Sequence, residues 1–339
     1  MASKRARWAS MQDVAREAGV SPQTVSRVSN GSEAVRPETR ERVQAVMQKL
    51  GYRPNFAGRA LKHGRFKDIG VAMFNMNTYG NMRILEGIST CAAAKGYATT
   101  VLTMQTTDEH PLRHAVEQMK QFPVDGMIVV LEQRVADFAD FTPPKDLPVI
   151  MVTEGPSNHC PTIDDDQYGC AASASEYLLS KGHRTVYHIA GPQHSQAAVS
   201  RERGWKDTLL QQGLRIPEPY IGDWNADSGY DAGRLFAADP QCTAVFAAND
   251  QMAYGAIQGI ESTGKRVPDD ISVMGVDDSL HGTVPRLSLT TMRMHFSQIA
   301  ENAFSMVLRA CEGDSPAVGV KTVIPAELIE RSSVRDLTV

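Results

Sequence analysis

Two hydrophobic patterns divide the chain. Near the N-terminus, apolar residues recur every three or four positions, and from residue 68 onward short apolar runs alternate with helix-length segments. The first pattern is typical of helices with one buried stripe. The second is typical of strands that are buried on both faces, as in parallel sheets of βαβ units. The sequence therefore predicts a small all-α module followed by a larger α/β module.

Three short helices are predicted in the N-terminal module. The first opens at a capping box formed by Ser10 and Asp13 and ends at Gly19. The second has Pro22 at its first position, where a missing N–H costs nothing. The third covers residues 37–50. A tight turn containing glycine between the first two helices is typical of a helix-turn-helix, whose second helix enters the major groove of DNA.

The second helix has a polar stripe opposite its two valines, Val25 and Val28. At helical spacing four polar side chains share one face: Gln23, Ser26, Arg27 and Asn30. Arginine can bind guanine and glutamine can bind adenine through two hydrogen bonds each. Ser26 and the neighbouring Thr24 have an alternative role, since both can satisfy local backbone groups. The stripe indicates a surface that reads DNA.

Charge is also divided between the modules. Residues 1–66 contain 13 lysines and arginines against 5 aspartates and glutamates, a net +8, whereas the whole chain carries −4, so the remainder carries −12. A basic module joined to an acidic one indicates a polyanionic partner for the first. A solvated basic arm would show the same charge, and the helical arrangement favours DNA over that alternative.

The bulk composition is that of an ordinary globular protein. The chain has 339 residues, of which 42% are hydrophobic and 22% charged. Its N-terminus lacks the apolar segment of a signal peptide, and no apolar run approaches the roughly 18 residues that span a bilayer. We therefore expect a cytoplasmic protein without membrane contact. The cysteines show no CxxC spacing, so neither disulfides nor a zinc site are expected: Cys91, Cys160, Cys170, Cys242 and Cys311.

Two stretches, MQDVAREAGVSPQTVSRVSNG and VRPETRERVQAVMQKLGYRPNFAGRAL, resemble the DNA-binding headpiece of the lac repressor (LacI/GalR) family. The resemblance implies that residues 1–53 form such a headpiece and places Pro22, Gln23 and Arg27 at base-contacting positions. Phosphate-contacting or supporting positions fall on Ser21, Thr24, Ser26 and Asn30. Pro22 stands where the lac repressor has an aromatic residue, which leaves the operator sequence open.

Residues 54–66 join the headpiece to the rest of the chain. The segment is short and contains Gly58, which weakens a helix by about 1 kcal/mol relative to alanine, so its residues alone describe a plain linker. The family resemblance implies instead a hinge helix that orders on DNA, with Leu61 as an apolar wedge in the minor groove, where such wedges kink the duplex. Three residues stand beside the wedge: Asn55, Ala57 and Arg59.

Residues 67–339 contain seven apolar runs with the pattern of buried strands: DIGVAM, ATTVLT, DGMIVVL, PVIMVT, RTVYHIAG, CTAVFAA and ISVMGVD. They predict two doubly wound parallel sheets. The region resembles the core of the lac repressor family, which is similar to periplasmic sugar-binding proteins. That resemblance implies two lobes around an effector-binding cleft, with crossings near residues 163, 291 and 325. Lobe one would hold residues 67–162 and 292–324, and lobe two residues 163–291 and 325–339.

Candidate effector-binding residues follow the strands, because ligands of α/β sheets bind at the carboxyl ends of strands. The resemblance implies that Arg201, Asn249 and Asp277 hydrogen-bond sugar hydroxyls, while Trp224 and Phe296 lie against apolar faces of the ring. A lobe-one wall and a cleft-edge carboxylate complete the set: Phe74, Asn75, Asn77, Tyr79 and Asp165. Capping roles for Asn249 and Asp277, and a core position for Trp224, are the structural alternatives.

Catalytic and metal-binding patterns do not fit the chain. The stretch GIESTGKR lacks the Ser/Thr of a phosphate-binding loop, and no GxSxG or HExxH occurs. The cluster Asp164, Asp165 and Asp166 lacks the spacing of an EF-hand, so we expect helix capping and cleft-edge contacts there rather than a metal. No cofactor is expected. A sugar-processing enzyme and a transport-associated binding protein are the competing classes, and the basic headpiece argues against both.

The sequence therefore predicts a transcriptional repressor of carbohydrate-utilisation genes. It would bind a palindromic operator as a homodimer, because two-fold protein symmetry mirrors the half-sites. A galactoside or other glycoside would release it. The alternative keeps the DNA-binding architecture with a purine or nucleoside effector, possibly a corepressor. Because the sequence ends in ERSSVRDLTV without leucine heptads, we expect a dimer rather than a tetramer.

Overall fold

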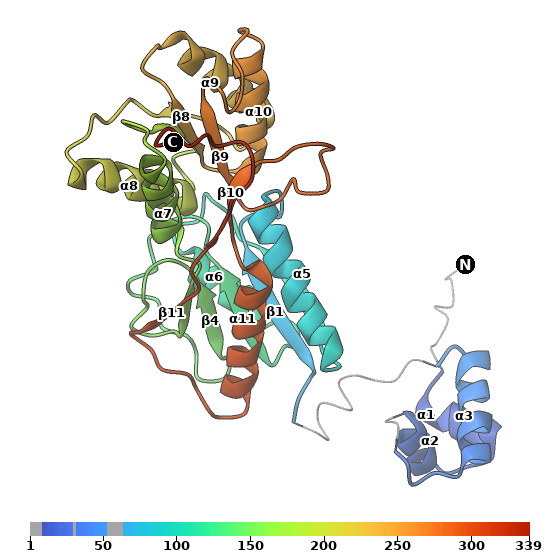
Figure 1. Ribbon diagram of the computed structural model, residues 1–339. Coiled ribbons are helices and arrows are strands. Elements are labelled where there is room, and N and C mark those ends of the chain that lie inside the picture. The colour runs from blue at the N-terminus through green and yellow to red at the C-terminus, as the bar shows by residue number, and fades with distance from the viewer. Residues whose placement is uncertain (1–8, 30–31, 53–63) are drawn as a thin grey trace, which may run out of the picture. The chain divides into compact units, whose positions relative to one another are not determined.

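The computed structural model describes residues 9–29, 32–52 and 64–339 (Figure 1). The chain divides into two compact units, residues 1–66 and 67–339. The first unit is all-α and the second is α/β. This is the fold class that the hydrophobic pattern predicts, and it is confirmed.

The first unit contains α1 (Met11–Ala18), α2 (Pro22–Ser29) and α3 (Pro37–Lys49). Its predicted capping box is present, since Ser10 Oγ accepts the N–H of Asp13 at 3.2 Å and the Asp13 carboxylate accepts the N–H of Ser10 at 2.9 Å. Gly19 ends α1 with φ +64°, a left-handed conformation that favours glycine. One apolar cluster holds the three helices together: Val14, Ala15, Ala18, Val25, Val28, Val35 and Val43.

The second unit contains two six-stranded sheets. Every strand pair of the lobe-one sheet is parallel, in the order β11 (Lys321–Val323), β5 (Thr162–Asp164), β4 (Val149–Val152), β3 (Gly126–Val130), β1 (Asp68–Met73) and β2 (Ala98–Thr103). The lobe-two sheet runs β12 (Glu327–Ile329), β10 (Thr290–Arg293), β9 (Ser272–Val276), β8 (Ala244–Ala247), β6 (Tyr187–Ala190) and β7 (Tyr220–Ile221). Only β12 is antiparallel to its described neighbour, β10. All seven runs predicted as strands are strands.

Helices pack against both sheets (Figure 1). Lobe one carries α5 (Tyr79–Ala94), α6 (Pro111–Met119) and α11 (Phe296–Cys311), and lobe two carries α7 (Gln167–Ser180), α8 (Gln196–Gln211), α9 (Ala226–Ala238) and α10 (Asp250–Glu261). Strands β3, β4, β6, β8 and β9 are buried along their whole length, as parallel strands covered on both faces must be. Burial of these strands explains why their sequences are continuous apolar runs.

The chain passes between the two lobes three times. Strand β5 pairs within the lobe-one sheet and β10 within the lobe-two sheet, so the first two passages follow residues 164 and 293. The approximate boundaries at 163 and 291 were therefore slightly early, because the chain completes each strand before it leaves the sheet. The third passage, between β11 and β12, includes residue 325.

No helix within the described ranges is long and apolar enough to cross a membrane. The five cysteines are free thiols, three of them buried.

Candidate functional site

The first candidate surface lies on α2. Val25 and Val28 point into the headpiece core, so the opposite side of this helix faces solvent. Pro22, Gln23 and Arg27 are exposed, as the helical spacing predicts. Within the described residues, no hydrogen bond or ion pair holds the Gln23 or Arg27 side chain. Both long side chains are therefore free to reach base edges.

Ser21 and Thr24 have a local role in the same helix. Ser21 Oγ accepts the backbone N–H of Thr24 at 3.2 Å and lies 3.0 Å from the Thr24 hydroxyl. Ser21 therefore caps α2, and the Thr24 hydroxyl bonds the Ser21 side chain rather than a backbone group. Five candidate DNA-contacting residues lie outside the described residues: Asn30, Asn55, Ala57, Arg59 and Leu61.

The second candidate site is a cavity of about 720 Å³ between the two lobes of the core. Its lining comes from both lobes, and chiefly from residues that directly follow strands, as expected for parallel sheets. Nine of the ten residues proposed from the sequence line it: Asn75, Asn77, Tyr79, Asp165, Arg201, Trp224, Asn249, Asp277 and Phe296. The structure thus brings together side chains that are up to 221 positions apart in the chain.

Phe74 is the exception, and its proposed place in the cavity wall was wrong. It directly follows β1 and is only 6% exposed, packed in the apolar core of lobe one with Ala72, Met104 and Leu112. The next residue, Asn75, turns into the cavity instead. An aromatic side chain beside a strand end is equally suited to the core beneath the sheet, and here the core receives it.

Arg201 and Asp277 form the charged centre of the lobe-two wall. Arg201 lies on α8, with its Nη2 3.7 Å from the Asp277 carboxylate, and both side chains are less than 10% exposed. Arg201 Nε donates to Gln167 Oε1 at 2.6 Å, and its Nη1 donates to the carbonyl of Ala248. Burial raises the pKa of Asp277, and the guanidinium opposes that shift. The pair is a preorganised polar group rather than a helix cap.

Asn249 and Trp224 are positioned by one another. Asn249 caps α10, because its Oδ1 accepts the N–H of Met252 at 2.9 Å, and its Nδ2 donates to the carbonyl of Trp224 at 3.0 Å. Trp224 has φ +74°, and its ring lies 5.9 Å from the Arg201 guanidinium. The two structural alternatives are thus answered: Asn249 both caps α10 and lines the cavity, and Trp224 lines the cavity while it packs against the edge of the lobe-two core.

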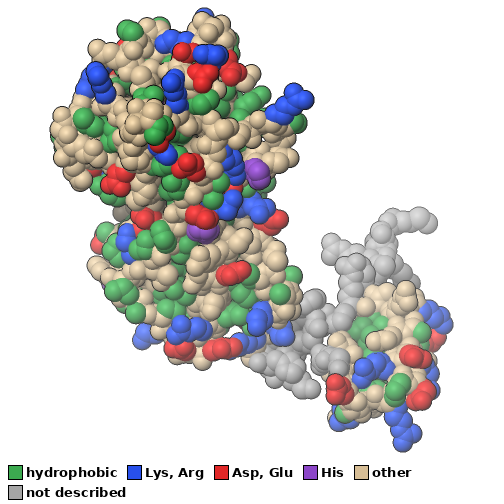
Figure 2. All heavy atoms as spheres, viewed as in Figure 1, with side chains coloured by type: hydrophobic (Ala, Val, Ile, Leu, Met, Phe, Trp, Pro, Cys, Tyr) green, Lys and Arg blue, Asp and Glu red, His purple; other side chains and the backbone are tan. Residues whose placement is uncertain are grey.

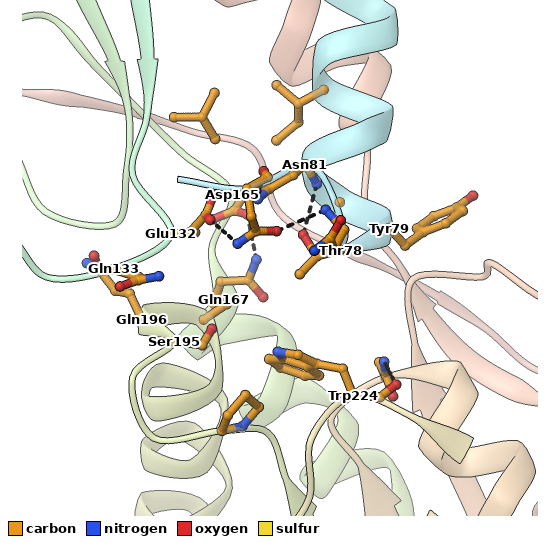
Figure 3. Close-up of a pocket in the computed structure, with 18 of the residues that line it drawn as sticks. Thr78, Tyr79, Asn81, Glu132, Gln133, Asp165, Gln167, Ser195, Gln196 and Trp224 are labelled. Carbon is orange, nitrogen blue, oxygen red and sulfur yellow. Dashed lines mark hydrogen bonds between the residues drawn. The ribbon is translucent and has the colours of Figure 1, made fainter. Parts of the chain in front are cut away.

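Tyr79 and Phe296 close the cavity at the start of α5 and α11. Their rings meet edge to face with centroids 5.8 Å apart. Phe296 is 7% exposed, so it offers only part of one face to a ligand. Figure 3 shows Trp224 and the cluster of Asn81, Glu132 and Asp165 on opposite sides of the pocket.

Sequence reasoning missed two glutamates on the lobe-one wall. Glu132 follows β3, and its two carboxylate oxygens accept the side-chain amides of Asn75 and Asn81. Glu154 follows β4 and accepts the hydroxyl of Ser200 from lobe two. Burial raises the pKa of Glu132 and of Glu154 to about 7. The available signal was their position, two residues beyond a buried strand in both cases.

Asp165 completes a line of carboxylates, since it follows the next strand, β5. Its carboxylate accepts the side-chain amide of Gln167, and burial raises its pKa to about 6. We call Glu132, Glu154 and Asp165 the acid row. Its neighbours have other partners: Asp166 caps α7, as the sequence predicts, and Lys321 pairs with Asp164. No cluster of metal-binding type occurs among the described residues.

Asp278, beside the cavity, belongs to a network at the passages between the lobes. Its carboxylate pairs with Arg293 on β10 at 2.6 Å and with Arg331 beyond β12 at 2.8 Å. Arg293 also lies 3.5 Å from Glu327. Charged and histidine side chains gather at this waist of the core (Figure 2). The consecutive residues Asp277 and Asp278 therefore connect the cavity to the segments that join the lobes.

Comparison with known proteins gives two family matches. Residues 10–55 match the model of bacterial regulatory proteins of the lacI family, and residues 175–334 match the periplasmic binding protein-like domain. The HTH-type transcriptional repressor PurR of Pectobacterium carotovorum is 32% identical over 97% of both chains. Catabolite control protein A of Priestia megaterium is 30% identical, covering 83% of this chain and 86% of its own.

Two solved structures extend the likeness to the fold. The lac repressor dimer bound to operator and the anti-inducer ONPF superposes with a TM-score of 0.80, at 28% identity, covering 97% of this chain and all of that one. The complex of the transcriptional regulator CelR with cellobiose superposes with a TM-score of 0.66, at 27% identity, covering 96% of this chain and 99% of that one.

Proposed function

Because the chain belongs to the lacI family and is one of its DNA-binding transcriptional repressors, we propose that a small molecule held between the lobes controls its binding to an operator. One observation carries the proposal: the same chain has an exposed polar face on α2 and, in its core, a cavity lined by polar and aromatic side chains of both lobes. The first suits base edges, and the second suits a small ligand.

DNA recognition is assigned to α2. Gln23 and Arg27 would read bases, with Pro22 beside them and Ser21, Thr24, Ser26 and Asn30 supporting the approach to the backbone. The hinge residues expected from the resemblance, with Leu61 as the wedge, would enter the minor groove. A homodimer on a palindromic operator is supported by the similarity to a lac repressor dimer bound to its operator.

Selection of operators from a random DNA library, followed by affinity measurements, tests this assignment. Arg27→Ala should weaken binding to the selected operator by about 1–3 kcal/mol and relax the preference for one base pair, because one bidentate contact is lost. Arg234→Ala, at an exposed position on α9, is the matched control and should leave operator affinity unchanged. Equal affinity of the wild type and Arg27→Ala would remove α2 from the recognition surface.

For the effector, the relatives favour a purine or nucleoside over the sugar that the sequence put first. Several of them carry the name PurR, which points to a purine. Trp224 supports this class, since its ring borders the cavity and could stack on a base. The amides and carboxylates around it could bind ring nitrogens and, in a nucleoside, the ribose hydroxyls.

A glycoside is the second candidate, on the evidence of the cavity lining. Carboxylates and amides of both walls bind neighbouring hydroxyls in pairs, and an aromatic face complements the C–H groups of a pyranose. The similarity to the CelR–cellobiose complex adds support.

A thermal-shift screen of the full chain against nucleobases, nucleosides, monosaccharides and disaccharides separates the two classes. A ligand at 100 times its dissociation constant adds about 2.7 kcal/mol of stability. The shift should disappear in Trp224→Ala and persist in the control Arg234→Ala. Operator affinity measured with the ligand then decides between inducer and corepressor. A ligand that binds without changing operator affinity would refute control by this cavity.

A further inference from the structure

The cavity has a marked charge imbalance. Five carboxylates line it, against one guanidinium, that of Arg201. Three of the five form the acid row on lobe one, and Asp223 and Asp277 belong to lobe two. This imbalance concerns the ligand directly, because every one of these groups borders the space that the ligand would fill.

The single guanidinium is already occupied by the protein. Arg201 donates to Gln167 and to the carbonyl of Ala248, and lies beside Asp277. Its side chain is 5% exposed. An anionic ligand would have to compete with these buried partners for the cation, and breaking them would leave the Asp277 carboxylate without its counter-charge.

The carboxylates of the acid row, in contrast, accept fewer hydrogen bonds than they have lone pairs for. A carboxylate offers about four lone-pair sites. Glu132 uses two of them on Asn75 and Asn81, and Glu154 uses one on Ser200. Glu154 Oε1 is buried and has no hydrogen-bond partner within the part of the chain that the structure describes. An unpartnered buried acceptor beside a cavity is a position for a donor group of a ligand.

Strand topology explains why these groups act together. Strands β3, β4 and β5 are adjacent and parallel, and Glu132, Glu154 and Asp165 each stand one or two residues beyond a carboxyl end. The three side chains therefore line one edge of the sheet. Burial is the main cause of the raised pKa values of Glu132 and Glu154, and within the described ranges no ion pair offsets it.

We propose that the acid row selects an uncharged, unphosphorylated effector that donates hydrogen bonds to Glu132 and Glu154, and that it excludes nucleotides, sugar phosphates and sugar acids. This inference rests on the proposed role of the cavity and narrows its ligand. A nucleoside, a nucleobase and a neutral sugar share the required chemistry, which is several O–H or N–H donors and no anionic group. A phosphate group would place its own negative charge beside the carboxylates of the acid row, which would repel it.

Tryptophan quenching tests the row without any effector. Trp8→Phe leaves Trp224 at the cavity and Trp205, which is fully buried. At pH 8 and low salt the row is ionised and weakly screened. With each ion's quenching normalised to that of free N-acetyltryptophanamide, caesium should quench Trp224 at least about three times better than iodide. Acrylamide, which is neutral, calibrates access. In Glu132→Gln/Glu154→Gln the ratio should fall toward one, while the exposed control Glu261→Gln should retain it.

Matched ligand pairs test selectivity on the full chain: adenosine with AMP, guanosine with GMP, and glucose with glucose 6-phosphate. In any pair that binds, the unphosphorylated member should bind at least about 30-fold more tightly, from like-charge repulsion across one cavity. A phosphorylated member of equal or higher affinity overturns the proposal. So does iodide quenching equal to that of caesium, or a ratio unchanged in the double variant. If no pair binds, the proposed effector classes fail, while quenching still decides the charge of the row.

Discussion

The two walls of the cavity use the same strand-end positions and differ in how their charges are compensated. On lobe two, Asp277 faces Arg201, and Asn249 has a partner for both ends of its amide. On lobe one, the side chains that donate to Glu132 and Glu154 are all neutral among the residues that the structure describes. The lobe-two wall is therefore a finished polar network that fixes geometry, whereas the lobe-one wall leaves hydrogen-bonding capacity for the ligand and sets which ligand fits.

Breaking the finished network should have the largest effect. Arg201→Ala leaves Asp277 buried without its cation, which costs about 3–5 kcal/mol of unfolding free energy and abolishes effector binding. Arg203→Ala, at an exposed position on the same helix, is the control and should change the unfolding free energy by less than about 1 kcal/mol. Denaturant unfolding measures both. An Arg201→Ala core as stable as the control would show that the pair is not preorganised.

Displacing the ring of Trp224 should have a smaller effect, confined to effector binding. A Cβ at Gly191 would lie 2.3 Å from the ring of Trp224, so Gly191→Ala must displace the ring. We expect effector affinity to fall by about 10–100-fold, the value of one stacked aromatic contact. Gly80→Ala on lobe one is the milder counterpart, because its Cβ would lie 3.1 Å from Phe296. Isothermal titration measures the loss of effector affinity in each variant and so compares the two walls. Equal losses of affinity would contradict a dominant role for Trp224.

The pH dependence of the unfolding free energy should be the smallest of the three effects, and it tests the same contrast between the two walls. Burial raises the folded-state pKa of Glu132 and Glu154 to about 7 from the ordinary value of 4.5, so the folded protein binds more protons than the unfolded chain between these pH values. Stability contributed by this difference is present at low pH and is lost as the pH rises through 7.

Between pH 6.5 and 8 the unfolding free energy of the unliganded protein should fall by about 1–2 kcal/mol, allowing for partial exposure. Burial lowers the pKa of His188 to about 4, below its ordinary value of 6.5, so this histidine adds stability as the pH rises through 6.5 and offsets a small part of the fall. Denaturant unfolding at the two pH values checks the slope, and Glu132→Gln/Glu154→Gln should reduce it. Part of the slope should remain, because burial also raises the pKa of Asp250 to about 7. Stability that rises over this window would contradict the elevated pKa values.

Much of the fold follows from local pattern. The capping box at Ser10, the glycine at the end of α1 and the seven apolar runs are signals carried by neighbouring residues, and each appears in the structure where the sequence places it. The positions predicted for the chain's passages between the lobes, near residues 163 and 291, were less exact. Strand pairing with distant residues decides where β5 and β10 end.

The cavity could be predicted only in part. Nine proposed residues line it because strand ends in parallel sheets converge, and resemblance identified which strand ends to inspect. Phe74 was misplaced because burial beneath a sheet and exposure at its edge differ by one residue. Glu132 and Glu154 carried no motif. Their partners Asn81 and Ser200 are 51 and 46 positions away, so their position two residues beyond a strand was the only signal in the sequence.

The central claim is that the cavity and the operator surface are coupled, and reciprocal binding tests it most directly. With the selected operator and the ligand found by thermal shift, operator affinity is measured with and without ligand, and ligand affinity with and without operator. The account predicts that both change by the same factor of about 5–150, and that the change disappears in Trp224→Ala. Ligand binding that leaves operator affinity unchanged would contradict it.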